Sequence, residues 1–88
     1  MTTDKTTTPA IARTLAEAHE AVAAIRPPRT APLTEWLAHH QRSAALYAEI
    51  AEIDRGHHHE ALFMVEREHQ RAKEIKTEIS SQQPTGET

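Results

Sequence analysis

Hydrophobic residues recur along most of the chain at intervals of three and four, the spacing that places them on one face of an α-helix. The first run lies between Pro9 and Pro27, and it predicts a helix over residues 9–26 with Thr8 as its N-cap. Pro27 and Pro28 end this helix because they lack backbone donors. Its narrow, coiled-coil-like apolar face consists of Ile11, Leu15, Ala18, Val22 and Ile25.

Two longer runs of the same periodicity predict helices over residues 32–54 and 58–79, with Pro32 at the start of the first. Gly56 lies between them, and glycine is the usual residue just past the end of a helix. We therefore expect an antiparallel helical hairpin closed at Gly56. The alternative is one continuous helix through Gly56, which would cost only about 1 kcal/mol relative to alanine.

The predicted fold is all-α, a three-helix arrangement of this hairpin and the N-terminal helix. We expect one helical domain over residues 9–79, a disordered N-terminus over 1–8 and a disordered polar tail over 80–88. The third helix begins with Ala61 to Val65, which are apolar all round, so we expect that end to be covered on more than one side.

The rise per residue sets the expected register of the hairpin, with Tyr47 near Val65 and Leu37 near Ile75. In the middle, His40 would face Glu68 and His69, a polar layer that could fix register and partner choice. We call the predicted apolar and polar contact positions the hairpin seam: Leu37, His40, Tyr47, Ile50, Val65, Glu68, His69, Ala72 and Ile75.

Composition predicts a thin core. The chain has 88 residues, 3% of them aromatic, and much of its apolar content is alanine, which contributes little buried area. A thin core in a well-patterned helical chain favours self-association or a partner that completes it. The formal net charge of −3 is made of interspersed signs, without the basic block that nucleic-acid binding needs.

The sequence also bears on location. Cysteine is absent, the N-terminus lacks the apolar core of a secretory signal, and no apolar run approaches membrane-spanning length. We therefore expect a cytoplasmic protein with no membrane partner.

Seven histidines are many for this length, and three are consecutive. His57, His58 and His59, with Asp54 before them, are the candidate metal ligands, for Zn²⁺ or Ni²⁺. Successive helical side chains point about 100° apart, so the three imidazoles cannot all face one ion from one helix. A second candidate, the Glu66/His69 pair, has the Glu-x-x-His spacing of di-iron bundles but lacks the other half of such a site.

Catalytic signatures are missing from the sequence. It contains no His-Glu-x-x-His, no phosphate-binding glycine loop and only two glycines in total. A helix-turn-helix reading would make the helix after Gly56 a recognition helix, but no Arg, Lys, Asn or Gln that could read bases occurs there before Arg67. We do not expect an enzyme, and DNA binding is an alternative to the main expectation.

The segment from Asp54 to Leu62 resembles two known groups. It is similar to the turn of a tetratricopeptide helical hairpin, which implies a hairpin and nothing more. Together with Trp36-Leu37, Arg42-Ser43-Ala44 and Tyr47 it also resembles a group of short, uncharacterised actinobacterial helical proteins, over about residues 14–75. In Phe63-Met64 the chain departs from a more aromatic pair. The resemblance implies no activity, cofactor or partner, and marks the histidine turn as a family feature.

The function that these patterns predict is protein–protein interaction or regulation without catalysis, with another protein or a second copy bound at the hairpin seam. The first helix offers a second candidate surface, residues 11–25. Two alternatives remain open: a metal sensor or carrier using the histidine turn, and a DNA-associated regulator.

Overall fold

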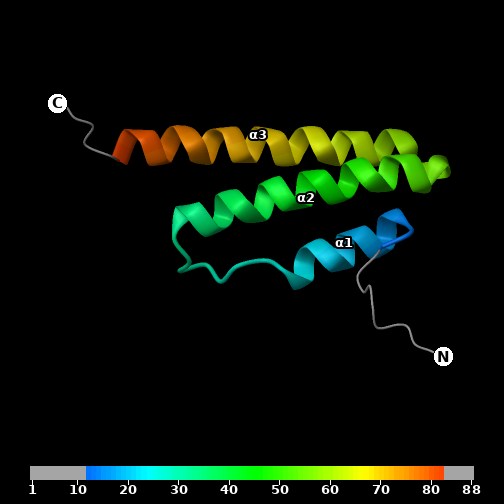
Figure 1. Ribbon diagram of the computed structural model, residues 1–88, viewed down its shortest axis with the longest axis horizontal. Coiled ribbons are helices and arrows are strands. Elements are labelled where there is room, and N and C mark those ends of the chain that lie inside the picture. The colour runs from blue at the N-terminus through cyan, green and yellow to red at the C-terminus, as the bar shows by residue number, and fades with distance from the viewer. Residues whose placement is uncertain (1–11, 83–88) are drawn as a thin grey trace.

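The computed structural model describes residues 12–82. Within this range the chain forms three α-helices and one short 3₁₀ helix, with no strand. They are, in chain order, α1 (Leu15–Ala24), α2 (Leu33–Ile53), the 3₁₀ turn η2 (Arg55–His57) and α3 (His58–Gln82). Helices α2 and α3 lie side by side and antiparallel, and α1 lies along the other side of α2 (Figure 1). The predicted all-α fold, a hairpin plus an N-terminal helix, is confirmed.

The first helix is shorter than the sequence pattern predicts. Residues 12–14 are not helical, so the prediction of a helix from residue 9 is wrong over these positions, while Thr8 and Pro9 lie outside the described residues. Thr14 is the N-cap, and its Oγ1 accepts a hydrogen bond from the amide of Glu17 at 3.1 Å. The Glu17 carboxylate in turn accepts from the amide of Arg13 at 2.8 Å. This is a variant of the capping box, whose Thr-x-x-Glu pattern was present in the sequence.

The hairpin turn does not depend on Gly56 in the way the sequence suggested. The chain leaves α2 at Asp54, with φ −96° and ψ 74°, and continues into η2. Gly56 lies inside η2 without a left-handed conformation, and a Cβ built on it would meet nothing within 4 Å. The prediction of a glycine C-cap is therefore wrong, although the turn is where it was expected. Arg55 and His58 instead donate to the carbonyl of Ala51, one of the last free acceptors of α2.

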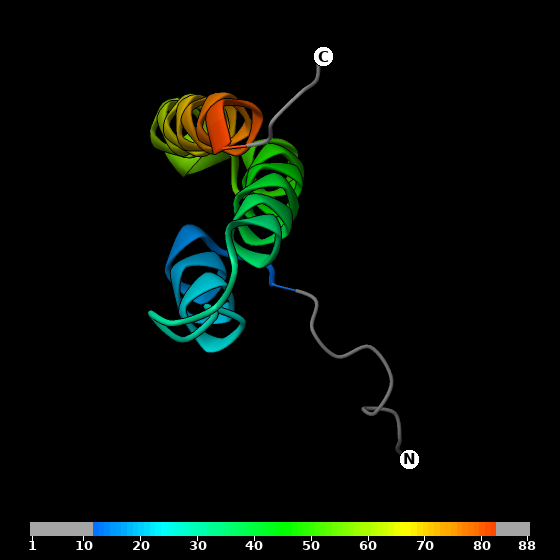
Figure 2. The same cartoon turned by 90° about the vertical axis from the view of Figure 1, so that its left-hand side faces the viewer.

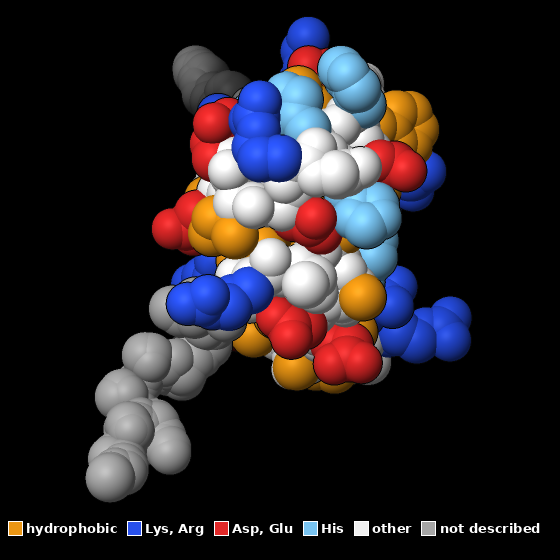
Figure 3. Space-filling view, turned by 90° about the vertical axis from the view of Figure 1, so that its right-hand side faces the viewer, with side chains coloured by type: hydrophobic (Ala, Val, Ile, Leu, Met, Phe, Trp, Pro, Cys, Tyr) orange, Lys and Arg blue, Asp and Glu red, His pale blue; other side chains and the backbone are white. Residues whose placement is uncertain are grey.

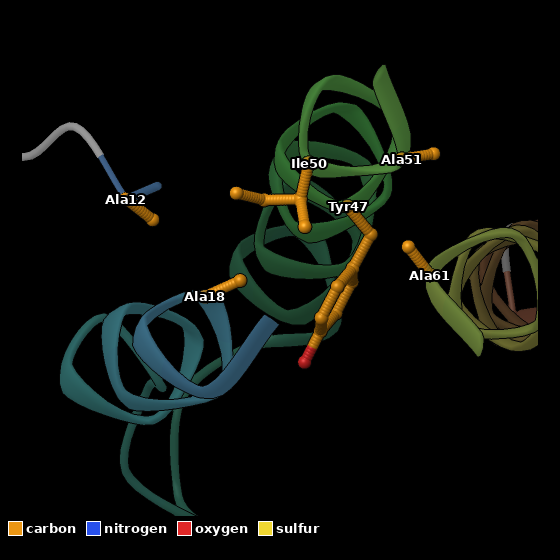
Figure 4. Close-up of a cluster of buried hydrophobic side chains, with 6 residues drawn as sticks. All are labelled: Ala12, Ala18, Tyr47, Ile50, Ala51 and Ala61. Atoms are coloured by element: carbon orange, nitrogen blue, oxygen red, sulfur yellow. The ribbon is translucent and has the colours of Figure 1, made fainter. Parts of the chain in front are cut away.

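The core lies where all three helices approach each other, towards the hairpin turn. Ala18 of α1, Ala51 of α2 and Ala61 of α3 are fully buried, and their small side chains allow the backbones to approach closely. Tyr47 and Ile50 are the largest fully buried side chains. In Figure 4 the Tyr47 ring extends from α2 into the space between α1 and α3. The thin core expected from composition is thus an alanine-lined contact around two larger side chains.

Helix α1 packs on α2 of its own chain, through Ala18 with Leu15 and Val22 beside it. Ile25, expected on the same face, is the C-cap residue and 40% exposed, and Ile11 lies outside the described residues. Seen along the hairpin, α1 and α3 lie on two sides of α2 and stay apart from one another (Figure 2). The three helices therefore form an open arrangement with α2 shared by both pairs.

The remaining boundaries agree with the sequence to within a few residues. Helix α3 continues to Gln82, so residues 80–82 are helical and not part of a disordered tail. The expected disorder of residues 1–8 and of the tail beyond position 82 concerns positions outside the described residues. None of the helices described is both long and apolar enough to cross a membrane.

Candidate functional site

A groove runs between α1 and α3, with α2 along its base. Its volume is about 670 Å³, within the range of ligand and peptide clefts. From α1 and the segment after it come His19, Val22, Ala23 and Arg26, and from α2 come Leu33, Trp36, His39 and His40. From α3 come Arg67, Glu68, Arg71, Glu74, Ile75 and Glu78. The groove exists because α1 and α3 do not close on each other.

The base of the groove contains the polar layer that the sequence predicted. The Nδ1 atom of His40 lies 2.6 Å from Oε1 of Glu68, and each side chain is only 12% exposed. This pair joins α2 to α3 in the middle of the hairpin. His69, expected in the same layer, is exposed on the far side of α3, beside Lys73 and Lys76. The prediction that His69 belongs to this layer is wrong, because its side chain points about 100° away from that of the preceding residue, Glu68.

His39 lies next to this pair and is nearly fully buried, with 5% exposure. Its ring makes edge contacts with Trp36 and His40, at centroid distances of 5.6 and 5.0 Å. Burial, and after it the neighbouring His40, lowers the pKa of His39 below its ordinary value of 6.5, so the ring is neutral at pH 7. Among the described residues its Nδ1 has no hydrogen-bond partner, and neither has Oγ of the buried Ser43 one turn later.

At the inner end of the groove, His19 and Tyr47 connect α1 to the core. Nδ1 of His19 lies 2.7 Å from the Tyr47 hydroxyl, and the two rings meet edge to face. Burial, and then the charge of Glu68, raises the pKa of the Tyr47 phenol, so the hydroxyl keeps its proton. His19 was not among the site residues predicted from the sequence. Helical spacing does place it beside the apolar face of α1, four residues after Leu15 and three before Val22, but nothing in the pattern pairs it with Tyr47.

The histidine turn has a structural role in this fold. Nδ1 of His58 lies 2.8 Å from the carbonyl of Ala51, and Nδ1 of His57 lies 2.9 Å from Oδ2 of Asp54. The ring of His59 stands edge-on to that of His58 and is exposed. Figure 3 shows this end of the molecule, where histidines lie among both acidic and basic side chains.

The proposed ligands Asp54, His57, His58 and His59 do not converge on one point. Over residues 12–82 no group of three or more His, Cys, Asp or Glu side chains is arranged to hold a metal ion. Two of the four cap helix ends: His58 at the end of α2 and Asp54 at the start of α1. The Glu66/His69 pair is exposed on α3.

Asp54 connects the hairpin turn to α1. Its Oδ2 also accepts a hydrogen bond from the amide of Leu15 at 2.9 Å, across 39 residues of sequence. It therefore holds the first turn of α1 against the hairpin turn. This backbone hydrogen bond is the main cause that lowers the pKa of the Asp54 carboxyl below its ordinary value of 3.8, with His57 contributing.

Most residues of the hairpin seam pack against other residues of the same chain. Tyr47, Ile50, Ala72 and Ile75 are buried, and Leu37 and Val65 are half-buried, within this one chain. These residues hold the hairpin together, so they are not a free surface for a partner. The exposed apolar side chains are different ones: Ile25 (40%), Ile53 (47%), Leu62 (41%) and Phe63 (61%). The first turns of α3, expected to be covered on several sides, are covered on one.

The groove is lined by both apolar and charged side chains. Its apolar positions are spread along the base and its charges lie along the rims, while Glu68 is already paired with His40. Trp36 lies half-buried at the base, with the Arg26 guanidinium 6.0 Å from its ring centroid. Apolar anchors inside a charged rim are the usual composition of a helix-binding surface.

No family model, no curated protein and no solved structure matches the chain. The likeness of the Asp54 to Leu62 turn to short actinobacterial proteins stays a prediction.

Proposed function

We propose that this protein is a small helical interaction module, not an enzyme, that works in the cytoplasm by binding a helix of another protein subunit in the groove between α1 and α3. The observation that supports it most is the groove itself. It provides partly accessible apolar side chains from two helices, Val22 of α1 and Leu33 and Trp36 of α2. A helix laid there would meet α1 and α3 along its sides and α2 below, completing a four-helix packing around one core.

The length of the groove fits this occupant. Its α3 side runs from Arg67 to Glu78, which corresponds to about 16 Å at 1.5 Å per residue. That is about three helical turns, enough for three or four side chains of one helix face to enter. The polar layer of His40 and Glu68 would give such a partner a fixed position along the groove, since an apolar residue placed over it would be disfavoured.

Photo-crosslinking in cells that naturally make the protein tests this proposal. A photoreactive phenylalanine derivative would replace Ala23 on the α1 wall or Glu78 on the α3 wall, both exposed positions lining the groove. The same residue at Glu49, exposed on α2 and not part of the groove lining, is the matched control. We expect one adduct of defined mass from both groove positions and none from Glu49. Equal labelling at all three positions, or no adduct from the groove, would refute the proposal.

A further inference from the structure

The α3 wall of the groove carries a charge pattern with internal symmetry. Arg67, Arg71, Glu74 and Glu78 recur at intervals of four, three and four, so they form one stripe along the helix. All four are exposed. The two arginines occupy the half of the stripe nearer the hairpin turn and the two glutamates occupy the other half.

This order is complementary to itself when reversed. Arg67 and Glu78 are equally distant from the midpoint between residues 72 and 73, and so are Arg71 and Glu74. If the same stripe of a second copy approached antiparallel, with a two-fold axis at that midpoint, every arginine would face a glutamate. A closed two-fold interface requires this property, because residue i meets residue j and j meets i. A parallel approach would oppose like charges throughout.

An exposed aromatic side chain borders the same stripe. Phe63 is 61% exposed, the most exposed of the large hydrophobic residues described, and it precedes Arg67 by one helical turn. In the antiparallel arrangement it would lie across from the last turn of the other copy's α3, near Gln82. Each end of the symmetric interface would then cover the Phe63 side chain of one copy.

We infer that the partner of this face is a second copy of the chain, bound through an antiparallel α3–α3 contact. The inference rests on the proposed function, because it names the occupant of the groove's α3 wall. Within one chain Arg71 already contacts Glu74 at 2.7 Å, and both are exposed, so this bridge adds little stability. The four charges set the orientation of the two copies, and covering Phe63 of each copy adds apolar burial.

Charge reversal in two halves tests the arrangement by sedimentation velocity from micromolar to millimolar protein. The variant Arg67→Glu/Arg71→Glu carries an entirely acidic stripe, and Glu74→Arg/Glu78→Arg an entirely basic one. Each alone should dissociate about tenfold more readily than the wild type or worse, since all facing pairs become repulsive. An equimolar mixture of the two should form heterodimers as stable as the wild-type dimer, because all pairs are again opposite.

The control is Lys73→Glu/Lys76→Glu, which changes the net charge equally on the opposite side of α3 and should leave the dimer intact. Circular dichroism verifies that each variant stays helical. The inference would be overturned if the wild type were a monomer at every concentration, or if the charge reversals left the dissociation constant of the dimer unchanged. The groove proposal would survive if Ala23 still crosslinked to a different protein, and would fall with the inference if no adduct formed.

Discussion

At the scale of single residues, the side chain that joins most parts of the molecule is Asp54. It ends α2, accepts the amide of Leu15 at the start of α1, and lies within hydrogen-bond distance of His57. A carboxylate at a helix N-terminus is also stabilised by the dipole of that helix. One short acidic residue in the hairpin turn therefore holds two helices that are distant in sequence.

Replacing Asp54 with asparagine should lower the melting temperature at neutral pH, because the charge at the start of α1 is lost. The folded state lowers the pKa of this carboxyl below 3.8, chiefly through the Leu15 amide. Its stabilising effect is therefore fully present above the unfolded value and is lost as the pH falls through the folded pKa. Melting curves of wild type and Asp54→Asn should differ by a constant amount above about pH 5 and converge in more acidic solution. A difference that grew in acid would contradict this assignment.

At the scale of helices, the sequence predicted both ends of α2 and the start of α3 to within one residue, because their apolar periodicity is long and bounded by Pro32 and the turn. It placed the start of α1 too early, since the periodicity of alanine-rich segments does not mark an end. The local Thr14/Glu17 capping pattern was the better signal there. The role of Asp54 could not be predicted, because its partner is 39 residues away.

The hairpin turn offers a direct test of what closes it. Gly56 has no left-handed backbone and an added Cβ would meet no atom within 4 Å. Gly56→Ala should therefore leave the fold intact and raise the free energy of unfolding by about 0.4–1 kcal/mol, by restricting the unfolded chain. Urea denaturation measures this change. A loss of more than about 1 kcal/mol would indicate that the turn needs glycine after all.

The His40–Glu68 pair should act on register more than on stability. Glu68→Leu alone leaves His40 without its partner in a site where both side chains are 12% exposed, and should cost about 1–3 kcal/mol. The double change His40→Leu/Glu68→Leu should recover that loss, since an apolar pair of similar volume is often as stable as a buried polar pair.

Urea denaturation and amide NMR spectra together separate these effects. The double variant should be stable yet show additional or broadened resonances from α2 and α3 as the helices sample other registers. If it remained as unstable as Glu68→Leu alone, the pair would be a stabilising element and not a register device.

At the scale of the whole molecule, the fold divides into a long hairpin and a short helix docked on one side of it. The groove follows from this division, because α1 contacts α2 and leaves α3 uncovered along its charged stripe. Periodicity reveals which residues of a helix are apolar, but not the angle at which a third helix crosses the other two. That is why the sequence placed the interaction surface on the hairpin seam, most of whose residues the fold buries or half-buries.

Native-state hydrogen exchange should show two levels of stability. α1 has 10 residues and only Ala18 of them is buried, so its amides should exchange through local undocking with protection well below that of α2 and α3. Thr14→Ala removes the N-cap and should accelerate exchange in α1, by about 0.5–2 kcal/mol of protection, without affecting the middle of the hairpin. Equal protection in all three helices would show instead that the chain unfolds as a single unit.

The hydrogen bond from Leu15 to Asp54 also bears on how the chain is made. Synthesis proceeds from the N-terminus, so the α1 segment leaves the ribosome 39 residues ahead of the carboxylate that holds its first turn. A helix of 10 residues is too short to persist alone in water. Helix α1 can therefore acquire this hydrogen bond only after Asp54 has emerged, and until then the nascent segment is exposed to chaperones and proteases.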